Sequence, residues 1–270
     1  MKKLSFLTVL VAAITFVACG GNKSAQPEAE SPDSLKTFEQ EQIEASIKMN
    51  FDSLASEIAR LKQLPLVQKD GMISLTDEER QVKPNYLLDP SIVETAMTLS
   101  EKYRVLSGVE VDREIALLYG LPIDDYDKAI AKLLADINDP SFEVLDNEAS
   151  IYECSQALYN AMEQNGRINF YWQLVSAALV EQLYILTRNT DKFMASFDDE
   201  AASNVSLRII LLQDAINRLT EYDPELLPVA EALDPLTVIN AVTVDELKQQ
   251  LVEVMDQVAA ARQALIQLEY

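Results

Sequence analysis

Apolar residues recur at helical spacing along most of this chain, and this pattern restricts its fold more than any other sequence feature. One stripe runs through Val205, Ile209, Leu212, Ile216 and Leu219. Steps of three and four residues place these side chains on one face of an α-helix, and that face packs on other helices. Similar stripes occupy 43–61, 92–106 and 247–268, and no segment sustains the alternation of a β-strand. We therefore predict an all-α protein, an irregular multi-helix bundle.

Capping residues indicate where the helices begin. Asp89 and Asp139 each precede a proline, the arrangement of an N-cap before a first-turn proline. Thr243, with Glu246 three residues later, matches a capping box. The expected helices are 37–63, 76–82, 90–107, 109–119, 124–137, 141–164, 168–188, 199–221, 225–232 and 244–269. We expect them to form a single all-helical domain over residues 37–270.

The predicted helix 168–188 differs from the others because its sequence is apolar on nearly every side as far as Leu186. A helix of that kind is surrounded by other helices, so we expect it at the centre of the bundle. A membrane-spanning helix is the competing interpretation. Gln173, Glu181 and Gln182 lie inside the apolar run and argue against a span.

Glu181 is the main candidate for a binding residue because it lies in this apolar helix. A buried carboxylate must be paired, hydrogen-bonded or protonated, and each of these states can serve a site. We expect Glu181 to be shielded from solvent and paired with a basic or hydroxyl group. Gln173, Tyr184 and Arg188 have the spacing to share its helix face and complete the set of candidate binding residues. The alternatives are an exposed helix edge or a purely structural ion pair.

Aromatic residues and one cysteine also fall at helical spacing in this part of the chain. We expect the aromatic side chains to lie in the core, with a sugar-stacking surface as the alternative. They are Tyr152, Tyr159, Tyr171, Trp172 and Tyr184. Cys154 shares a stripe with Leu158 and Met162, so we expect a small buried residue rather than a nucleophile.

The composition excludes several kinds of chemistry. The chain has no histidine, which rules out histidine-based triads and histidine-ligated zinc or haem. It contains neither a glycine-rich nucleotide-binding motif nor the nucleophile elbow of hydrolases. A formal net charge of −22 repels nucleic acid. We therefore expect no catalytic set, no cofactor, no metal site and no nucleic-acid partner, and the lack of a catalytic set favours a non-enzymatic role.

The first 36 residues have the pattern of an export signal followed by a tether. Two lysines precede an apolar stretch, and together they predict a signal peptide over residues 1–18. The motif Phe16-Val17-Ala18-Cys19 resembles the bacterial lipobox, in which the cysteine is acylated and becomes the new N-terminus. Residues 19–36 are mostly small and polar and predict a flexible tether behind the lipidated cysteine.

These features predict that Cys19 carries palmitate or a similar acyl group and attaches the protein to a membrane. The first acidic residue after the cysteine is Glu28, so no acidic run follows Cys19 directly. We therefore expect the protein in the cell envelope at the outer membrane, facing the periplasm rather than the cell surface.

The whole layout resembles the helical lipoproteins of Bacteroidetes. The shared features are a signal that starts Met1-Lys2-Lys3 and ends Ala18-Cys19, a polar tether and an all-helical body. The segment from Trp172 through Glu181 to Ile185 is also similar to the central helix of an uncharacterised helical lipoprotein family in that phylum. The resemblance implies a lipid-anchored envelope protein and assigns no activity.

The sequence thus favours a membrane-anchored lipoprotein with a non-enzymatic binding or structural role and an envelope protein as its partner. Two alternatives remain open. One is a solute- or glycan-binding lipoprotein of an uptake system, and the other is an all-α enzyme that uses carboxylates.

Overall fold

A computed structural model describes residues 48–49, 52–53, 84–145, 155–188 and 190–268. Helices are the regular secondary structure of these residues and no strand occurs among them, so the predicted all-α fold class is confirmed. The α-helices are α3 (Leu99–Leu118), α4 (Asp124–Ile137), α5 (Ser155–Gln164), α6 (Ile168–Arg188), α7 (Thr190–Phe193), α8 (Asp199–Leu219), α9 (Leu227–Leu233), α10 (Val244–Glu253) and α11 (Met255–Arg262). The 3-10 helices are η3 (Pro90–Glu94), η4 (Pro140–Val144), η5 (Pro224–Leu226) and η6 (Asp234–Val238), and η7 (Gln263–Gln267) is a π-helical turn.

Several predicted boundaries are confirmed. Helices α4 and α6 have the predicted limits, 124–137 and 168–188. Helix α8 begins where Asp198 accepts a hydrogen bond from the backbone N–H of Ala201 at 2.8 Å. The predicted capping box of Thr243 and Glu246 is present at the start of α10. Apart from 48–49 and 52–53, which are helical, the predicted helices 37–63 and 76–82 lie outside the described residues.

The limits of the predicted helices 90–107 and 109–119 are wrong, although residues 99–107 and 109–118 are helical as expected. The chain forms η3 after the Asp89 cap and then a single long helix, α3. A capping box starts α3, because Thr98 accepts a hydrogen bond from the N–H of Glu101 while the Glu101 side chain accepts from the N–H of Thr98. The prediction ended a helix just before Gly108, but α3 continues through that glycine.

The C-terminal prediction also needs correction, because residues 244–269 do not form one helix. The helix is interrupted at Val254, which ends α10 and precedes α11, and the π-helical turn η7 follows α11. The predicted helix 141–164 starts as η4 and contains α5, with 146–154 outside the described residues. The predicted helix 225–232 is divided between η5 and α9.

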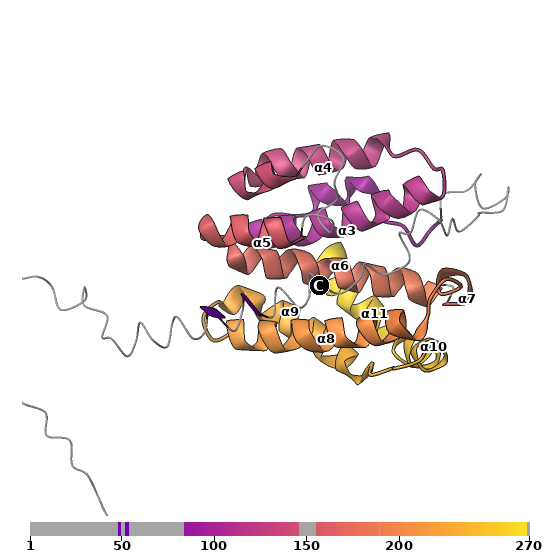
Figure 1. Ribbon diagram of the computed structural model, residues 1–270. Helices are drawn as coiled ribbons and strands as arrows, with labels where there is room; N and C mark the ends of the chain where they lie inside the picture. The colour runs from indigo at the N-terminus through magenta and orange to yellow at the C-terminus, as the bar shows by residue number, and fades with distance from the viewer. Residues whose placement is uncertain (1–47, 50–51, 54–83, 146–154, 189, 269–270) are drawn as a thin grey trace, which may run out of the picture. The chain divides into compact units, whose positions relative to one another are not determined.

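Helix α6 is at the centre of the fold, as its sequence predicts. It contacts α3 and α5 on one side, α8, α9 and α10 on the other, and also α7 and α11 (Figure 1). All described residues belong to one compact unit, Ala45–Tyr270. None of the described helices combines the length and the apolar character of a membrane span.

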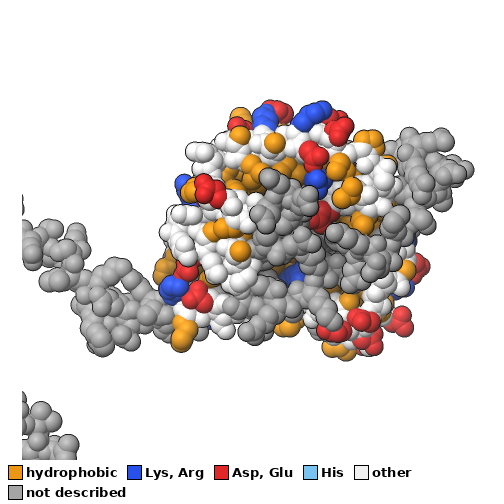
Figure 2. All heavy atoms as spheres, turned by 45° about the horizontal axis from the view of Figure 1, so that its top comes forward, with side chains coloured by type: hydrophobic (Ala, Val, Ile, Leu, Met, Phe, Trp, Pro, Cys, Tyr) orange, Lys and Arg blue, Asp and Glu red, His pale blue; other side chains and the backbone are white. Residues whose placement is uncertain are grey.

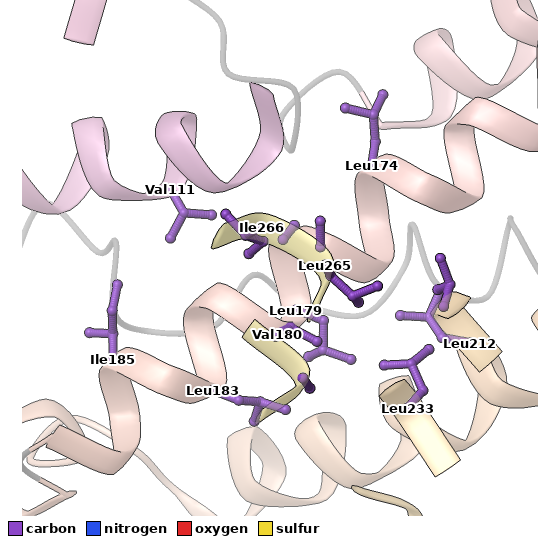
Figure 3. Close-up of a cluster of buried hydrophobic side chains, with 14 of the residues drawn as sticks. Val111, Leu174, Leu179, Val180, Leu183, Ile185, Leu212, Leu233, Leu265 and Ile266 are labelled. Carbon is purple, nitrogen blue, oxygen red and sulfur yellow. The ribbon is translucent and has the colours of Figure 1, made fainter. Parts of the chain in front are cut away.

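The core forms where α3, α6, α8, α9, α11 and η7 meet. Leu179, Val180 and Leu183 of α6 project toward side chains that arrive from later parts of the sequence (Figure 3). Those side chains include Leu212, Leu233, Leu265 and Ile266. Burial of each such aliphatic side chain contributes about 1.5–3 kcal/mol to folding before the entropic cost, so this junction is a major source of stability.

Aromatic side chains fill the layer between α5 and α6. Tyr159, Tyr171 and Trp172 are buried and meet edge to face, with ring centroids 5.1 Å apart for Tyr159 and Tyr171 and 5.3 Å apart for Tyr171 and Trp172. Tyr184 is half-buried, while Tyr152 lies outside the described residues. The expected core position is therefore confirmed for Tyr159, Tyr171 and Trp172.

Gly108 allows η7 to pack closely against α3. A Cβ atom at this position would lie 2.8 Å from Cγ2 of Ile266, which is shorter than a normal carbon–carbon contact. Because this methyl group branches directly from the Cβ of Ile266, it has little freedom to move away. The close approach of the two segments therefore depends on glycine at position 108.

Replacing Gly108 with Ala is expected to destabilise the protein by about 1 kcal/mol. Overpacking costs about 1–3 kcal/mol, and the better helix propensity of Ala offsets about 1 kcal/mol of that cost. Chemical denaturation measures the change. The matched background is Ile266→Leu, which removes the β-branched methyl group at nearly constant volume. Equal costs of Gly108→Ala in both backgrounds would show that this contact is not the cause.

Candidate functional site

Glu181 lies in the interior and binds an arginine from the C-terminal part of the chain. The carboxylate is 0% exposed, and Arg262 of α11 is 3% exposed. Arg262 Nε donates to Glu181 Oε2 at 2.7 Å, and Arg262 Nη2 donates to Glu181 Oε1 at 2.8 Å. Two parallel hydrogen bonds between a guanidinium and a carboxylate are the strongest geometry for such a pair. The expectation that Glu181 is shielded and paired with a basic group is thus confirmed.

A second carboxyl group, Asp112 of α3, completes the buried charge cluster of Asp112, Glu181 and Arg262. Asp112 is 0% exposed, and its Oδ2 lies 3.9 Å from Arg262 Nη2. That separation is an ion-pair distance without a direct hydrogen bond. The cluster therefore joins three helices, α3, α6 and α11, that lie far apart in the sequence.

The cluster also fastens the segment 84–89 to these helices. The backbone N–H of Leu88 donates to Asp112 Oδ2 at 2.5 Å, and Arg262 Nη2 donates to the carbonyl oxygen of Tyr86 at 3.0 Å. From α4, the hydroxyl group of Tyr126 donates to the carbonyl oxygen of Leu88 at 2.9 Å. Backbone groups of a non-helical segment are thus satisfied by side chains of the helical core.

Burial dominates the electrostatics of the cluster. It raises the pKa of Asp112 well above its ordinary value, and the negative charge of Glu181 adds to the effect. Burial also raises the pKa of Glu181, although the charge and hydrogen bonds of Arg262 oppose this change. For Arg262, burial lowers the pKa, but the charge and hydrogen bonds of Glu181 outweigh burial, so the pKa is raised.

Gln173 lies in a second polar network two turns before Glu181 on α6. Gln173 Oε1 accepts a hydrogen bond from Nη1 of the buried Arg104 at 2.9 Å, and Gln173 Nε2 donates to the carbonyl oxygen of Glu225 at 3.2 Å. Arg104 Nε also donates to the carbonyl oxygen of Leu265 at 2.9 Å. This network connects α3 and α6 to η5 and η7.

Tyr184 and Arg188 lie at the C-terminal end of the same helix face. The Tyr184 ring has the guanidinium carbon of Arg262 at 3.9 Å and that of Arg188 at 4.2 Å from its centroid. Both distances are typical of cation–π contacts. Arg188 is exposed and also donates from Nη2 to Thr187 Oγ1 at 3.1 Å.

The structure therefore brings together only part of the predicted face. Glu181 and Tyr184 both contact Arg262, whereas Gln173 belongs to the Arg104 network. Arg188 is not the partner of Glu181, because seven residues of helix separate them by about 10 Å along the axis. The sequence analysis did not identify Arg262 or Asp112 as residues of this site. A signal was present for Arg262, since it immediately follows Ala261 of the apolar stripe.

What this arrangement can do chemically is limited by its burial. Glu181 and Asp112 have no exposed surface, so they are closed to a dissolved substrate as the structure stands. Within the described part of the chain, no group of three or more acidic or cysteine side chains is placed to hold a metal ion. In the described residues, the cluster joins α3, α6 and α11 in the core.

Comparisons with protein-family models, with curated proteins and with solved structures gave no match for this chain.

Replacing Arg262 with Met is expected to destabilise the protein by about 3–5 kcal/mol, because it leaves the buried Glu181 carboxylate without its cation. The double replacement Glu181→Leu with Arg262→Met removes both charges. Its free energy of unfolding is expected to recover most of this loss, since apolar packing often replaces a buried ion pair, while Asp112 keeps its hydrogen bond from the N–H of Leu88. Urea denaturation at neutral pH measures all three proteins.

A matched control is Arg218→Met, which breaks an exposed ion pair with Asp214 at 3.0 Å. This change should cost no more than about 1 kcal/mol. If the double variant were as unstable as Arg262→Met alone, loss of packing rather than a stranded charge would be the cause.

Proposed function

We propose that this protein is a membrane-anchored bacterial lipoprotein with a non-enzymatic binding or structural role in the cell envelope. The observation that carries the proposal is the motif Phe16-Val17-Ala18-Cys19 behind a basic and apolar N-terminus. Acylation at Cys19 supplies the membrane attachment, and the polar residues 20–36 separate the anchor from the helical body. The outer membrane, with the protein facing the periplasm, is the proposed location.

The buried position of the candidate chemical groups supports a non-enzymatic role. Glu181 and Asp112 are enclosed in the core, with Arg262 as the facing cation. A carboxylate-based enzyme needs such groups at a surface that substrate reaches. The described aromatic residues that a glycan-binding surface would use, Tyr159, Tyr171 and Trp172, are buried as well. These placements favour a binding or structural role over both alternatives.

The surface carries charged side chains and a number of individual exposed apolar side chains that a partner could contact. Acidic side chains lie at several places on the face shown in Figure 2, with apolar side chains between them. Exposed ion pairs include those of Lys128 with Asp125 and Lys132 with Glu94. Exposed large apolar residues include Met97, Leu117, Leu207, Ile210, Tyr222, Val242 and Val252. A partner protein is therefore expected to be recognised through apolar contacts framed by acidic residues.

Replacing Cys19 with Ala is expected to abolish acylation and either block signal cleavage or release soluble protein. Metabolic labelling with radioactive palmitate and fractionation of membranes measure both effects. The matched control is Cys154→Ala, which changes the other cysteine of the chain and should keep the label and the membrane location. If Cys19→Ala remained labelled and membrane-bound, the lipoprotein assignment would be wrong.

A partner is tested by placing a photo-reactive amino acid at exposed positions in living cells. The photo-reactive residue replaces one exposed residue at a time, for example Leu207 or Val252. We expect at least one group of neighbouring positions to give a cross-linked protein band. The buried position Leu212 is the matched control and should give none. Absence of protein adducts at every exposed position would contradict an envelope protein partner.

A further inference from the structure

Asp112 has one acceptor atom for which the described residues provide no donor. Asp112 Oδ2 accepts from the N–H of Leu88, whereas the buried Oδ1 has no hydrogen-bond partner within the described residues. Asp139 provides the contrast within the same fold. Its Oδ2 accepts from the hydroxyl group of Tyr103, and its Oδ1 accepts from the N–H of Ser141 at 2.8 Å. Both carboxyl oxygens of Asp139 thus accept a hydrogen bond, whereas only one of those of Asp112 does so within the described residues.

The groups that face Asp112 indicate which hydrogen bond its Oδ1 atom can form. Glu181 comes from α6 and Arg262 from α11. Arg262 Nη2 lies 2.8 Å from Glu181 Oε1 and 3.9 Å from Asp112 Oδ2, so the two carboxyl groups face the same guanidinium nitrogen. In addition to burial, which raises the pKa of both groups, a hydrogen bond between these carboxyl groups raises the pKa of Asp112 and lowers that of Glu181. Such a bond between two carboxyl groups requires one proton, because two ionised carboxylates have only acceptor atoms. The same proton reduces the charge of the two carboxyls to match the single charge of Arg262.

Among the residues that the structure describes, the other titratable groups at this site do not supply a second positive charge. Tyr126 of α4 is buried, its pKa is raised by burial and then by Asp112, and its hydroxyl group is bonded to the Leu88 carbonyl. Asp89 adds negative potential at Tyr126. Tyr184 of α6 places its ring against Arg262. With both carboxyls ionised, the cluster would hold a net negative charge in the interior, at a high cost.

We propose that Asp112 and Glu181 share one proton at neutral pH, carried by Asp112, and that loss of this proton releases the segment 84–89. With the proton in place, Asp112 donates to Glu181, and Glu181 stays free to bind Arg262 through both oxygens. Without it, two adjacent carboxylates repel each other and compete for one guanidinium. The contacts at stake include Leu88 with Asp112 and Arg262 with Tyr86, which hold this non-helical segment.

The direction of the pH effect follows from linkage. The folded protein binds this proton more tightly than the unfolded chain, in which an Asp has an ordinary pKa of about 4. The contribution to stability is fully present below that pKa and is lost as the pH rises through the raised pKa of folded Asp112. Between the two pKa values, one shared proton changes the unfolding equilibrium constant by a factor of about ten for each pH step of one.

The test compares wild-type protein with Asp112→Asn, in which the amide group donates to Glu181 without needing a proton. Infrared spectroscopy of protein with isotope-labelled aspartate is expected to show a protonated carboxyl band at neutral pH in the wild type. The band should be absent from Asp112→Asn and retained in Asp139→Asn, the matched control. Between the pKa values of Asp112 in the unfolded and folded protein, the wild type should lose stability relative to Asp112→Asn as the pH rises. The ratio of their unfolding constants should change by about tenfold for each pH step of one.

Two further readouts separate the shared proton from burial alone. In Glu181→Gln, Asp112 faces Arg262 without a second carboxylate, so it is expected to ionise and lose the protonated band. Hydrogen exchange of the Leu88 amide, expressed as protection relative to an unfolded peptide, should weaken with rising pH in wild type and stay constant in Asp112→Asn. A wild-type spectrum without a protonated aspartate, a band that survives in Glu181→Gln, or equal Leu88 protection at every pH in the two proteins would overturn the proposal.

Discussion

The ion pair of Glu181 and Arg262 is the interaction on which the packing of the C-terminal helices depends. Removing two charges from water costs several kcal/mol for each ion, and only good geometry with additional hydrogen bonds offsets this cost. Here the pair has two direct hydrogen bonds, a further bond to the Tyr86 carbonyl and the ring of Tyr184 against the guanidinium. Such a combination restricts α11 to one position and rotation along α6, which apolar contacts alone would specify less strictly.

The neighbouring contacts build on this fixed position. Once α11 is placed, the π-helical turn η7 carries Leu265 and Ile266 to α3, where Gly108 leaves room for Ile266 and Arg104 binds the Leu265 carbonyl. Buried polar contacts therefore alternate with apolar packing along the contact of α3 with η7. Helix α3 is buried on more than one side because α4, α6 and η7 all pack on it, and its buried Ser107 donates to the Leu174 carbonyl oxygen of α6.

Sequence patterns were sufficient for the fold class and for most of the central helix. The apolar run of α6 correctly predicted both its limits and its central position, and it correctly indicated that Glu181 is buried and paired. The identity of the partner could not be read in the same way, because Glu181 and Arg262 are separated by 81 residues. The helix breaks at Thr95–Met97 and Val254 were also missed. Apolar spacing continues across both breaks. At the first break, the capping box of Thr98 and Glu101 was a readable local signal that the prediction overlooked, whereas Val254 at the second break makes no side-chain cap.

We expect the buried charge cluster to make α3, α6 and α11 one cooperative unit, while the proposed acylation of Cys19 would serve membrane attachment. Native-state hydrogen exchange at low denaturant concentration tests this claim most directly, since it resolves the opening free energy of each helix. We predict that the slowest amides of α3, α6 and α11 exchange only through global unfolding and share one free energy of opening. Exchange of α11 through a separate opening, at a clearly lower free energy than α3 and α6, would contradict it.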